Sequence, residues 1–434
     1  MYMEIEKQKS KDILDKIGYN VNLAQLHKIY KENLYIEDTD RIDAVLAAAL
    51  SSKLPGISIW LIIVGPSGDL KSVQLNAIRG EDVFVLHNLT SKTLVNGHRN
   101  KINFPDLAPE LDGKIVIIPD MAQILKLPAV EKGELWGQLR DLYDGLAGKV
   151  SGMGSRAQYE NLKVTLLAGS TPAIDGQILV HQDLGTRELV YRTSGNKNKE
   201  KVMKKCFENE EYEEKINKEL KEVTTKFLSQ KKITRKDIPK EVLDELMKIA
   251  IYTSNMRATA EFDSYTSELR NFVYPEEPTR LSKQLKRYYI CLKNLDKNYK
   301  DSDALRILWH IGKSSAFPLR IKIFEYLLEK DEEISTSKIA EDLEMGKKTI
   351  FRECNILQSI GLVKCKWEET NYPDKFYYYW KIVKDKAKTF NPSPYVVHND
   401  KNNKGIYSII SGDGLQRNLV EKDQIPGLQE AFDG

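Results

Sequence analysis

The sequence predicts an α/β protein built around a parallel sheet. Short, continuous apolar runs rich in β-branched residues recur between residues 54 and 195, and such runs are typical of strands buried on both faces. They are Ile57–Val64, Val83–Leu86, Lys114–Ile118 and Leu162–Ala168. Helical stretches such as Gly133–Tyr143 separate them, and this alternation implies βαβ crossovers. A glycine-containing loop follows the first run directly.

Composition excludes several classes of protein. The chain has 434 residues, of which 41% are hydrophobic and 30% charged, so we expect a soluble protein of roughly two to four domains. The net charge of +3 gives no global basic field, and nucleic-acid binding would need a local basic surface. The four cysteines lack CxxC spacing, which argues against zinc and against a disulfide framework.

Targeting signals are not evident in the sequence. The N-terminal stretch is charged and lacks the apolar run of a signal peptide. The longest apolar run, Ile57–Val64, is far too short to cross a bilayer. We therefore expect a cytoplasmic protein without a membrane partner.

Shifts in composition predict five regions. Apolar residues at helical spacing, ending at Pro55-Gly56, indicate an N-terminal helical segment over residues 1–53. The strand-rich core spans 54–195. From 196 to 317 Lys and Glu dominate and apolar residues keep helical spacing, which predicts an all-α lid. Residues 318–384 form a further domain, and the polar tail 385–434 is assigned no fold.

The fourth region has the pattern of a winged helix. A helix over Arg320–Lys330 precedes two helices, Ser335–Leu343 and Lys347–Ile360, that a turn at Gly346 joins. Two strand-like runs follow, Leu362–Trp367 and Lys375–Ile382. Helix, helix-turn-helix and hairpin in this order are typical of winged-helix domains.

The loop after the first strand has the spacing of a P-loop. It lies between a predicted strand and the helix-compatible stretch Val73–Ile78, the context that supports this motif. Backbone N–H groups of such a loop cradle phosphates, while the lysine neutralises the β- and γ-phosphates and the serine ligates Mg²⁺. The sequence therefore predicts ATP and Mg²⁺ binding by eight residues: Gly65, Pro66, Ser67, Gly68, Asp69, Leu70, Lys71 and Ser72.

One position departs from the usual pattern. Leu70 stands before the lysine, where glycine is customary. A side chain there would crowd the loop or force another backbone angle. The alternative interpretations are an ordinary glycine-containing turn, or a loop that no longer binds nucleotide.

Polar residues at the ends of the other predicted strands complete a candidate site. Asp120 ends the buried run that starts at Lys114, where a carboxylate can hold Mg²⁺, although it could also simply end a strand. Met121 follows it, at the place where many such ATPases have a glutamate base. Thr171 ends the last run and could sense the γ-phosphate or cap a turn. Arg187 and Arg192 could be arginine fingers for a neighbouring subunit, or ordinary surface arginines.

Four segments together resemble the P-loop ATPases of phages and integrated mobile elements, which are often primase–helicase-like. They are Trp60–Val64 with its loop, Leu139–Gly145, Leu167–Asp175 and Leu184–Arg192. The layout is also similar to that of minichromosome maintenance helicases. This resemblance implies an AAA+-like ring homo-oligomer, with six subunits as one option. It implies that Lys71, Ser72, Asp120, Thr171 and Arg187 act together, and that Arg257 and Arg280 in the lid reach the γ-phosphate.

The predicted winged helix carries basic residues. Lys347, Lys348 and Arg352 lie on the second helix of the helix-turn-helix, away from its apolar face, as a recognition helix requires. The hairpin adds Lys366 and Lys375 among tyrosines. DNA contact is one interpretation, and a protein-docking module is the other.

These observations predict an ATP-dependent, helicase-like DNA motor in the replication or maintenance of a mobile element. An ATP-switched DNA-binding regulator without unwinding activity is the main alternative. A toxin- or defence-type ATPase whose winged helix docks a protein is a third. The absence of an acidic residue beside Asp120 leaves the turnover rate open.

Overall fold

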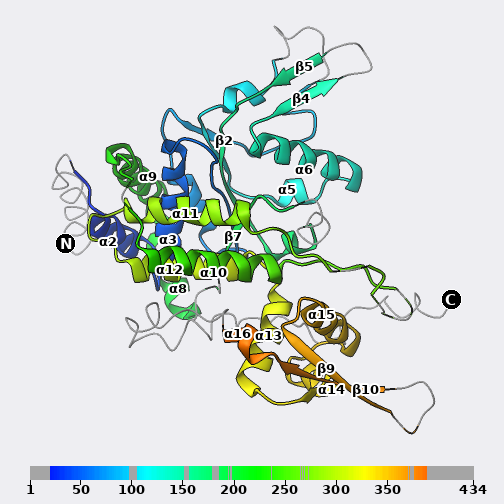
Figure 1. Ribbon diagram of the computed structural model, residues 1–434. Coiled ribbons are helices and arrows are strands. Elements are labelled where there is room, and N and C mark those ends of the chain that lie inside the picture. Colours follow the sequence, from blue (N-terminus) through cyan, green and yellow to red (C-terminus); the bar gives the residue numbers. More distant parts are fainter. Residues whose placement is uncertain are drawn as a thin grey trace, which may run out of the picture.

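Five parallel strands form the centre of the molecule (Figure 1), and the sequence predicts four of them. The computed structural model describes residues 20–96, 105–150, 156–177, 185–193, 195, 198–235, 237–263, 265, 267, 269–271, 273–369, 371 and 376–388. The sheet has the order β2-β3-β6-β1-β7. Its strands are β1 (Trp60–Val64), β2 (Val83–Val85), β3 (Ile115–Ile118), β6 (Thr165–Ser170) and β7 (Leu189–Arg192).

Strand β1 is buried on both faces, which explains its continuous apolar run. Alternate side chains of a strand point to opposite faces of the sheet. Leu61 and Ile63 therefore join one hydrophobic cluster, while Trp60, Ile62 and Val64 join another. The parallel neighbours β6 and β7 pair with both edges of β1.

Helices cover both faces of the sheet. The first cluster includes α2 (Leu23–Asn33), α3 (Asp40–Leu50), α9 (Glu213–Gln230), α10 (Lys240–Met256), α11 (Thr279–Lys293) and α12 (Asp301–Ser314). The second lies under α5 (Ala122–Leu125) and α6 (Ala129–Tyr143). The remaining short elements are α8 (Lys199–Asn209), η1 (Ser51–Lys53), η2 (Ala108–Leu111), η3 (Pro172–Ile174) and η5 (Glu210–Tyr212).

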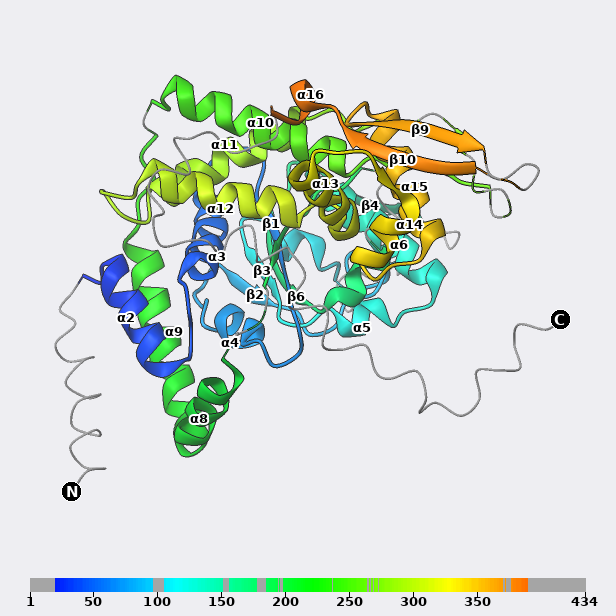
Figure 2. The ribbon, with the colours of Figure 1, turned by 90° about the horizontal axis from the view of Figure 1, so that it is seen from below.

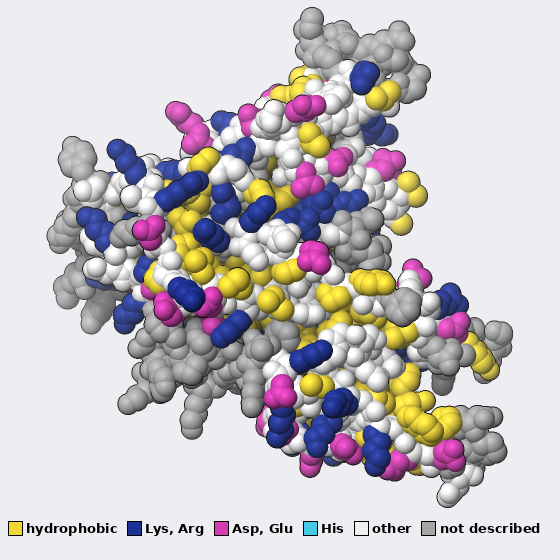
Figure 3. Space-filling view, viewed as in Figure 1, with side chains coloured by type: hydrophobic (Ala, Val, Ile, Leu, Met, Phe, Trp, Pro, Cys, Tyr) yellow, Lys and Arg dark blue, Asp and Glu magenta, His cyan; other side chains and the backbone are white. Residues whose placement is uncertain are grey.

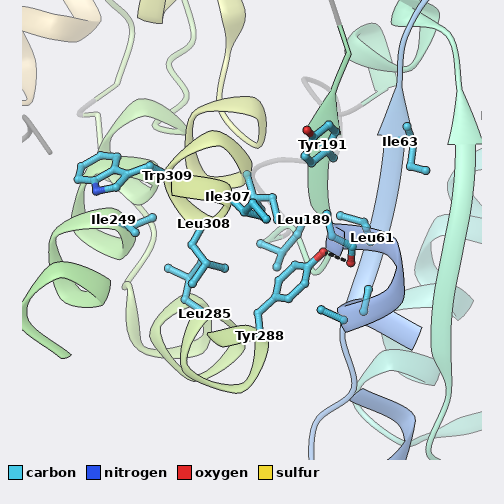
Figure 4. Close-up of a cluster of buried hydrophobic side chains, with 14 of the residues drawn as sticks. Leu61, Ile63, Leu189, Tyr191, Ile249, Leu285, Tyr288, Ile307, Leu308 and Trp309 are labelled. Atoms are coloured by element: carbon cyan, nitrogen blue, oxygen red, sulfur yellow. Dashed lines mark hydrogen bonds between the residues drawn. The ribbon is translucent and has the colours of Figure 1, made fainter. Parts of the chain in front are cut away.

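The helices of the expected lid pack directly on the sheet. Leu285 of α11 and Leu308 of α12 lie in the same buried cluster as Leu189 and Leu61 (Figure 4). The Tyr288 hydroxyl donates to the Ala44 carbonyl at 2.7 Å and so ties α11 to α3. Residues of the region 196–317 therefore share one core with the sheet.

Strand β7 was not predicted as a strand, and it forms one edge of the sheet. Its outer backbone groups are bonded by α12: the N–H groups of Val190 and Arg192 donate to the hydroxyls of Ser315 and Ser314 at 2.8 and 3.2 Å. His310 Nε2 donates to the Arg192 carbonyl at 2.8 Å. Covering an edge in this way prevents pairing with other chains.

A two-stranded antiparallel ribbon is inserted between α6 and β6. It consists of β4 (Ala147–Val150) and β5 (Arg156–Tyr159). The ribbon projects from the core (Figure 1), and Val150 is 76% exposed. This ribbon was not predicted.

The C-terminal module lies beside α10 and α12 (Figure 2). It contains α13 (Pro318–Lys330), β8 (Ile334–Ser335), α14 (Thr336–Asp342), α15 (Lys347–Ser359), β9 (Val363–Glu369), β10 (Phe376–Ile382) and α16 (Lys384–Lys388). Its antiparallel sheet has the order β8-β10-β9. The three longer helices and the hairpin follow the order that the sequence predicts for residues 318–384, while β8 and α16 were not predicted.

A buried arginine joins this module to the rest of the chain. Arg320 of α13 is 1% exposed, and its Nη1 donates to the carbonyls of Met256, at 3.0 Å, and Ala258. Its Nε donates to Glu353 of α15 at 2.8 Å. No helix in the described part of the chain is long and apolar enough to cross a membrane.

We predict that Leu285→Ala lowers the free energy of unfolding by about 3 kcal/mol, because it leaves a cavity between α11 and the sheet. Urea denaturation measures this change. Met247→Ala on neighbouring α10 is the control, since Met247 is 51% exposed and its truncation should cost less than about 0.5 kcal/mol. Equal effects of the two substitutions would contradict the shared core.

Candidate functional site

The predicted phosphate loop lies between β1 and α4 (Lys71–Asn76), at the carboxyl edge of the sheet. The ends of β6 and β3 lie next to it: the Gly65 N–H donates to the Ser170 carbonyl at 3.2 Å, and Ser72 Oγ donates to the Pro119 carbonyl at 3.2 Å. Open α/β sheets bind ligands at this edge. The structure thus brings the loop, Asp120 and Thr171 to one place.

Two glycines permit this close approach. A Cβ atom on Gly65 would lie 1.9 Å from the Thr193 hydroxyl oxygen. One on Gly169 would lie 2.5 Å from the Pro119 carbonyl oxygen. Any larger residue would force the strand ends apart.

Leu70 adopts a backbone conformation that normally requires glycine. Its φ and ψ are 54° and 14°, in the left-handed region. This conformation costs a residue with a Cβ roughly 1–2 kcal/mol. The side chain is half-buried and packs against the main core. The loop therefore keeps a glycine-type turn although it carries a leucine.

Lys71 lies across the loop. It is 8% exposed, and its Nζ donates to the carbonyls of Gly65, at 2.9 Å, and Pro66. Desolvation lowers the pKa of Lys71, while the charges of Asp69 and Asp120 act in the opposite direction. The ammonium group is therefore held inside the loop, within the electrostatic influence of Asp120.

Ser72 and Asp120 offer oxygen ligands on adjacent elements. Ser72 contacts the carbonyl of Pro119, the residue before Asp120. Asp120 is exposed, and its Oδ1 accepts from the Ala122 N–H at 2.9 Å. Mg²⁺ is usually held by one or two protein oxygens together with phosphate and water, so this pair fits it. No group of three or more His, Cys, Asp or Glu suited to a metal occurs among the described residues.

An ion pair that the sequence did not suggest holds the loop from the side. Arg41 Nη1 of α3 donates to Asp69 Oδ2 at 2.9 Å and to the Asp69 carbonyl at 3.0 Å. The Thr193 hydroxyl donates to the same carboxylate oxygen. Asp69 is buried and Arg41 half-buried, with 6% and 13% of their side chains exposed. An aspartate inside a phosphate loop was the one signal in the sequence that a nearby cation was needed.

The predicted sensor Thr171 follows β6 directly and is half-buried. It begins the short helix η3, and its side chain makes no capping hydrogen bond there. Its carbonyl accepts from the Ser170 hydroxyl at 3.1 Å. Because β6 pairs with β1, Thr171 lies at the same edge as the loop.

The two candidate arginine fingers are bonded within their own chain. Arg192 pairs opposite Val64, and its guanidinium donates to both carboxylate oxygens of Asp175 at 3.0 and 2.6 Å. Arg187 donates to Asp144 at 2.7 Å and to the Gly185 carbonyl at 2.6 Å. Either residue would have to leave its carboxylate before it could serve a neighbouring subunit.

The structure does not bring Arg257 and Arg280 to the phosphate loop, which corrects the expectation drawn from the resemblance. Arg257 is 2% exposed and donates to Glu276 and to the carbonyls of Ser315 and Glu188. Arg280 donates to Glu276 and to the Thr186 carbonyl. These contacts lie around the start of β7, whereas the loop lies at its end.

Three of the predicted DNA contacts are exposed, and Arg352 is half-buried. Lys347 and Lys348 lie exposed at the start of α15. Arg352 lies over the Phe262 ring at 5.4 Å and donates to the Asp263 carbonyl at 3.3 Å. Lys366 is exposed and pairs with Glu368 at 3.0 Å. Lys375 lies outside the described residues.

No protein-family model and no curated protein matches this chain. Function is therefore inferred from the loop and from the strand ends around it.

We predict that Arg41→Ala lowers the free energy of unfolding by about 3 kcal/mol, because it leaves the Asp69 carboxylate buried without its cation. Urea denaturation again provides the measurement. The double variant Arg41→Ala, Asp69→Asn should be more stable than Arg41→Ala alone, since it buries no uncompensated charge. A double variant that is less stable than the single one would show that the ion pair does not anchor the loop.

Proposed function

We propose that the chain is a P-loop ATPase of the AAA+-like type that acts as a helicase-like DNA motor in the replication or maintenance of a mobile element. The observation that carries the proposal is the loop after β1. It combines a glycine-type turn at Leu70, an inward lysine at Lys71, and the oxygen ligands Ser72 and Asp120 at the adjoining strand end. The sheet order, with β1 between β6 and β7, supports a P-loop core.

ATP binding would exchange contacts that the loop now makes with itself. Lys71 would leave the carbonyls of Gly65 and Pro66 and neutralise the β- and γ-phosphates. Backbone N–H groups from Gly65 to Ser72 would cradle the phosphates. Ser72 and Asp120 would hold Mg²⁺, which when bound neutralises charge on the phosphates. Thr171 would orient the γ-phosphate or the attacking water.

The residue after Asp120 cannot act as a catalytic base. Met121 occupies the place of the usual glutamate and is 1% exposed, packed into the core under α6. Release of Arg192 from Asp175, or of Arg187 from Asp144, would complete a site between subunits of a ring. Turnover would then depend on assembly.

The C-terminal module would supply DNA binding as a winged helix. Its elements follow the helix-turn-helix and hairpin order, and α15 begins with the exposed Lys347 and Lys348. The hairpin presents Lys366 on the same face as Tyr377, which is 55% exposed, while Trp367, 58% exposed, lies on the other face. Cations next to aromatic rings suit phosphates and bases.

A second candidate is an ATP-switched DNA-binding regulator without unwinding activity. The buried Met121 favours it, because a site without a general base hydrolyses ATP slowly and so keeps the nucleotide bound. A strand-displacement assay with ATP separates the two. Duplex unwinding coupled to ATP consumption supports the motor, and nucleotide-dependent DNA binding without unwinding supports the regulator.

We predict that Lys71→Ala abolishes binding of a fluorescent ATP analogue in the presence of Mg²⁺, because the loop loses the charge that neutralises the phosphates. Fluorescence titration measures the affinity. Lys218→Ala, an exposed lysine of α9, should bind like the parent. Unchanged nucleotide affinity in Lys71→Ala would refute the proposed site.

We also predict that the double variant Lys347→Ala, Lys348→Ala binds duplex DNA more weakly. The slope of log affinity against log salt should fall by up to about 1.8, since each lost phosphate contact removes about 0.9. Anisotropy of a labelled duplex at several salt concentrations measures both quantities, and ATP binding should persist. A variant with the parent's slope would exclude α15 as the contact.

A further inference from the structure

A wide open groove lies near the amino end of β1, at the opposite end of the sheet from the phosphate loop. Its volume is about 750 Å³. Leu54 and Ile57 line it from the segment before β1, and α11 forms another wall. The full lining is Leu54, Ile57, Arg235, Asp237, Ile238, Leu243, Lys283, Lys286, Arg287 and Ile290.

The polar side chains of this groove are predominantly cationic. Lys283, Lys286 and Arg287 come from α11, Arg235 from the segment before α10, and Asp237 is the one acidic residue of the lining. None of these four cations forms an ion pair in the described part of the chain. In Figure 3 dark blue side chains gather over and beside α11, with hydrophobic ones between them.

The backbone before β1 fixes one of these cations. Arg287 Nη1 donates to the Pro55 carbonyl at 2.7 Å and Nη2 to the Leu54 carbonyl at 3.2 Å, while its buried Nε has no hydrogen-bond partner. Burial lowers the pKa of Arg287, and the like charge of Arg235 lowers it further. Burial also lowers the pKa of Lys163, and the like charge of Arg287 lowers it further. Arg287 is thus held against the repulsion of Arg235, and a bound anion would relieve this cost.

The spacing along α11 suits a linear polyanion. Three lining residues follow Lys283 on α11 by three, four and seven positions, so they share its helix face: Lys286, Arg287 and Ile290. Lys283 and Arg287 are about 6 Å apart along the helix axis. An enclosed pocket would suit a small anion, whereas an open groove with cations in a row suits a chain that carries one charge per unit.

We propose that this groove binds the phosphate backbone of single-stranded nucleic acid, with its apolar lining against the sugars and bases. The inference extends the DNA-associated function proposed above and adds a contact separate from α15. It is also separate from the nucleotide site, because the five residues of β1 place the two ends of this strand about 17 Å apart. A strand in the groove and ATP in the loop can therefore be bound together.

The test is the double variant Lys283→Ala, Lys286→Ala in the full-length chain. Fluorescence anisotropy of a labelled oligothymidine is followed across salt concentrations. Two lost phosphate contacts should lower the salt slope by about 1.4, and should weaken binding roughly 25-fold at 0.1 M salt. The charge-matched control is Lys218→Ala, Lys221→Ala on the exposed side of α9, which should bind like the parent. Urea denaturation confirms that both variants fold.

Three outcomes would overturn the inference. The parent could fail to bind oligothymidine at low salt, or the groove variant could keep the parent's affinity and slope. In the third, the groove variant would lose binding of a labelled oligoglutamate peptide but keep oligothymidine binding, which would assign the groove to an acidic protein segment. Binding of the fluorescent ATP analogue is measured in parallel, so failure of the groove is distinguished from failure of the nucleotide site.

Discussion

The structure depends on the burial of β1, which is enclosed on both faces and paired along both edges. Its two sets of alternate side chains enter separate hydrophobic clusters, and β6 and β7 occupy its flanks. Because β1 is enclosed on every side, its backbone can reach a ligand only where the strand ends. The chain leaves the sheet at Gly65, at the edge where β3 and β6 also end. The candidate nucleotide site therefore follows from the position of one strand.

The loop tolerates unusual residues because its neighbours hold it. A free Asp69 carboxylate would repel phosphates, but Arg41 and Thr193 bind it and so offset its charge. The same contacts fix the backbone next to Leu70 in its left-handed conformation. Strained backbone at a ligand site persists when surrounding contacts determine it. Helix α3 and the end of β7 are thus part of the site although neither is part of the motif.

The C-terminal module is joined to the core by buried apolar side chains and by polar contacts. Arg320 joins α13 to the end of α10, and Arg352 of α15 contacts Phe262 and Asp263 in the segment that follows α10. Helix α12, next to α10, in turn covers β7 and bonds Arg192. A change at Arg192 would therefore reach the module through α12 and α10. This arrangement would couple the proposed nucleotide site to the proposed DNA-binding module.

Local patterns in the sequence determined the α/β class, four of the five parallel strands and the place of the candidate phosphate loop between β1 and α4. They also determined the order of elements in the C-terminal module, because hydrophobic periodicity and a short spaced motif depend only on neighbouring residues. Tertiary structure alone decided that β7 is a strand, since Leu189–Arg192 is short and gains its partners from β1 and α12. It also decided that Arg41 pairs with Asp69, that α10–α12 pack on the sheet, and that Arg257 and Arg280 lie near the start of β7. These features join residues far apart in the chain, and no local pattern specifies which distant charge or apolar face a residue will meet.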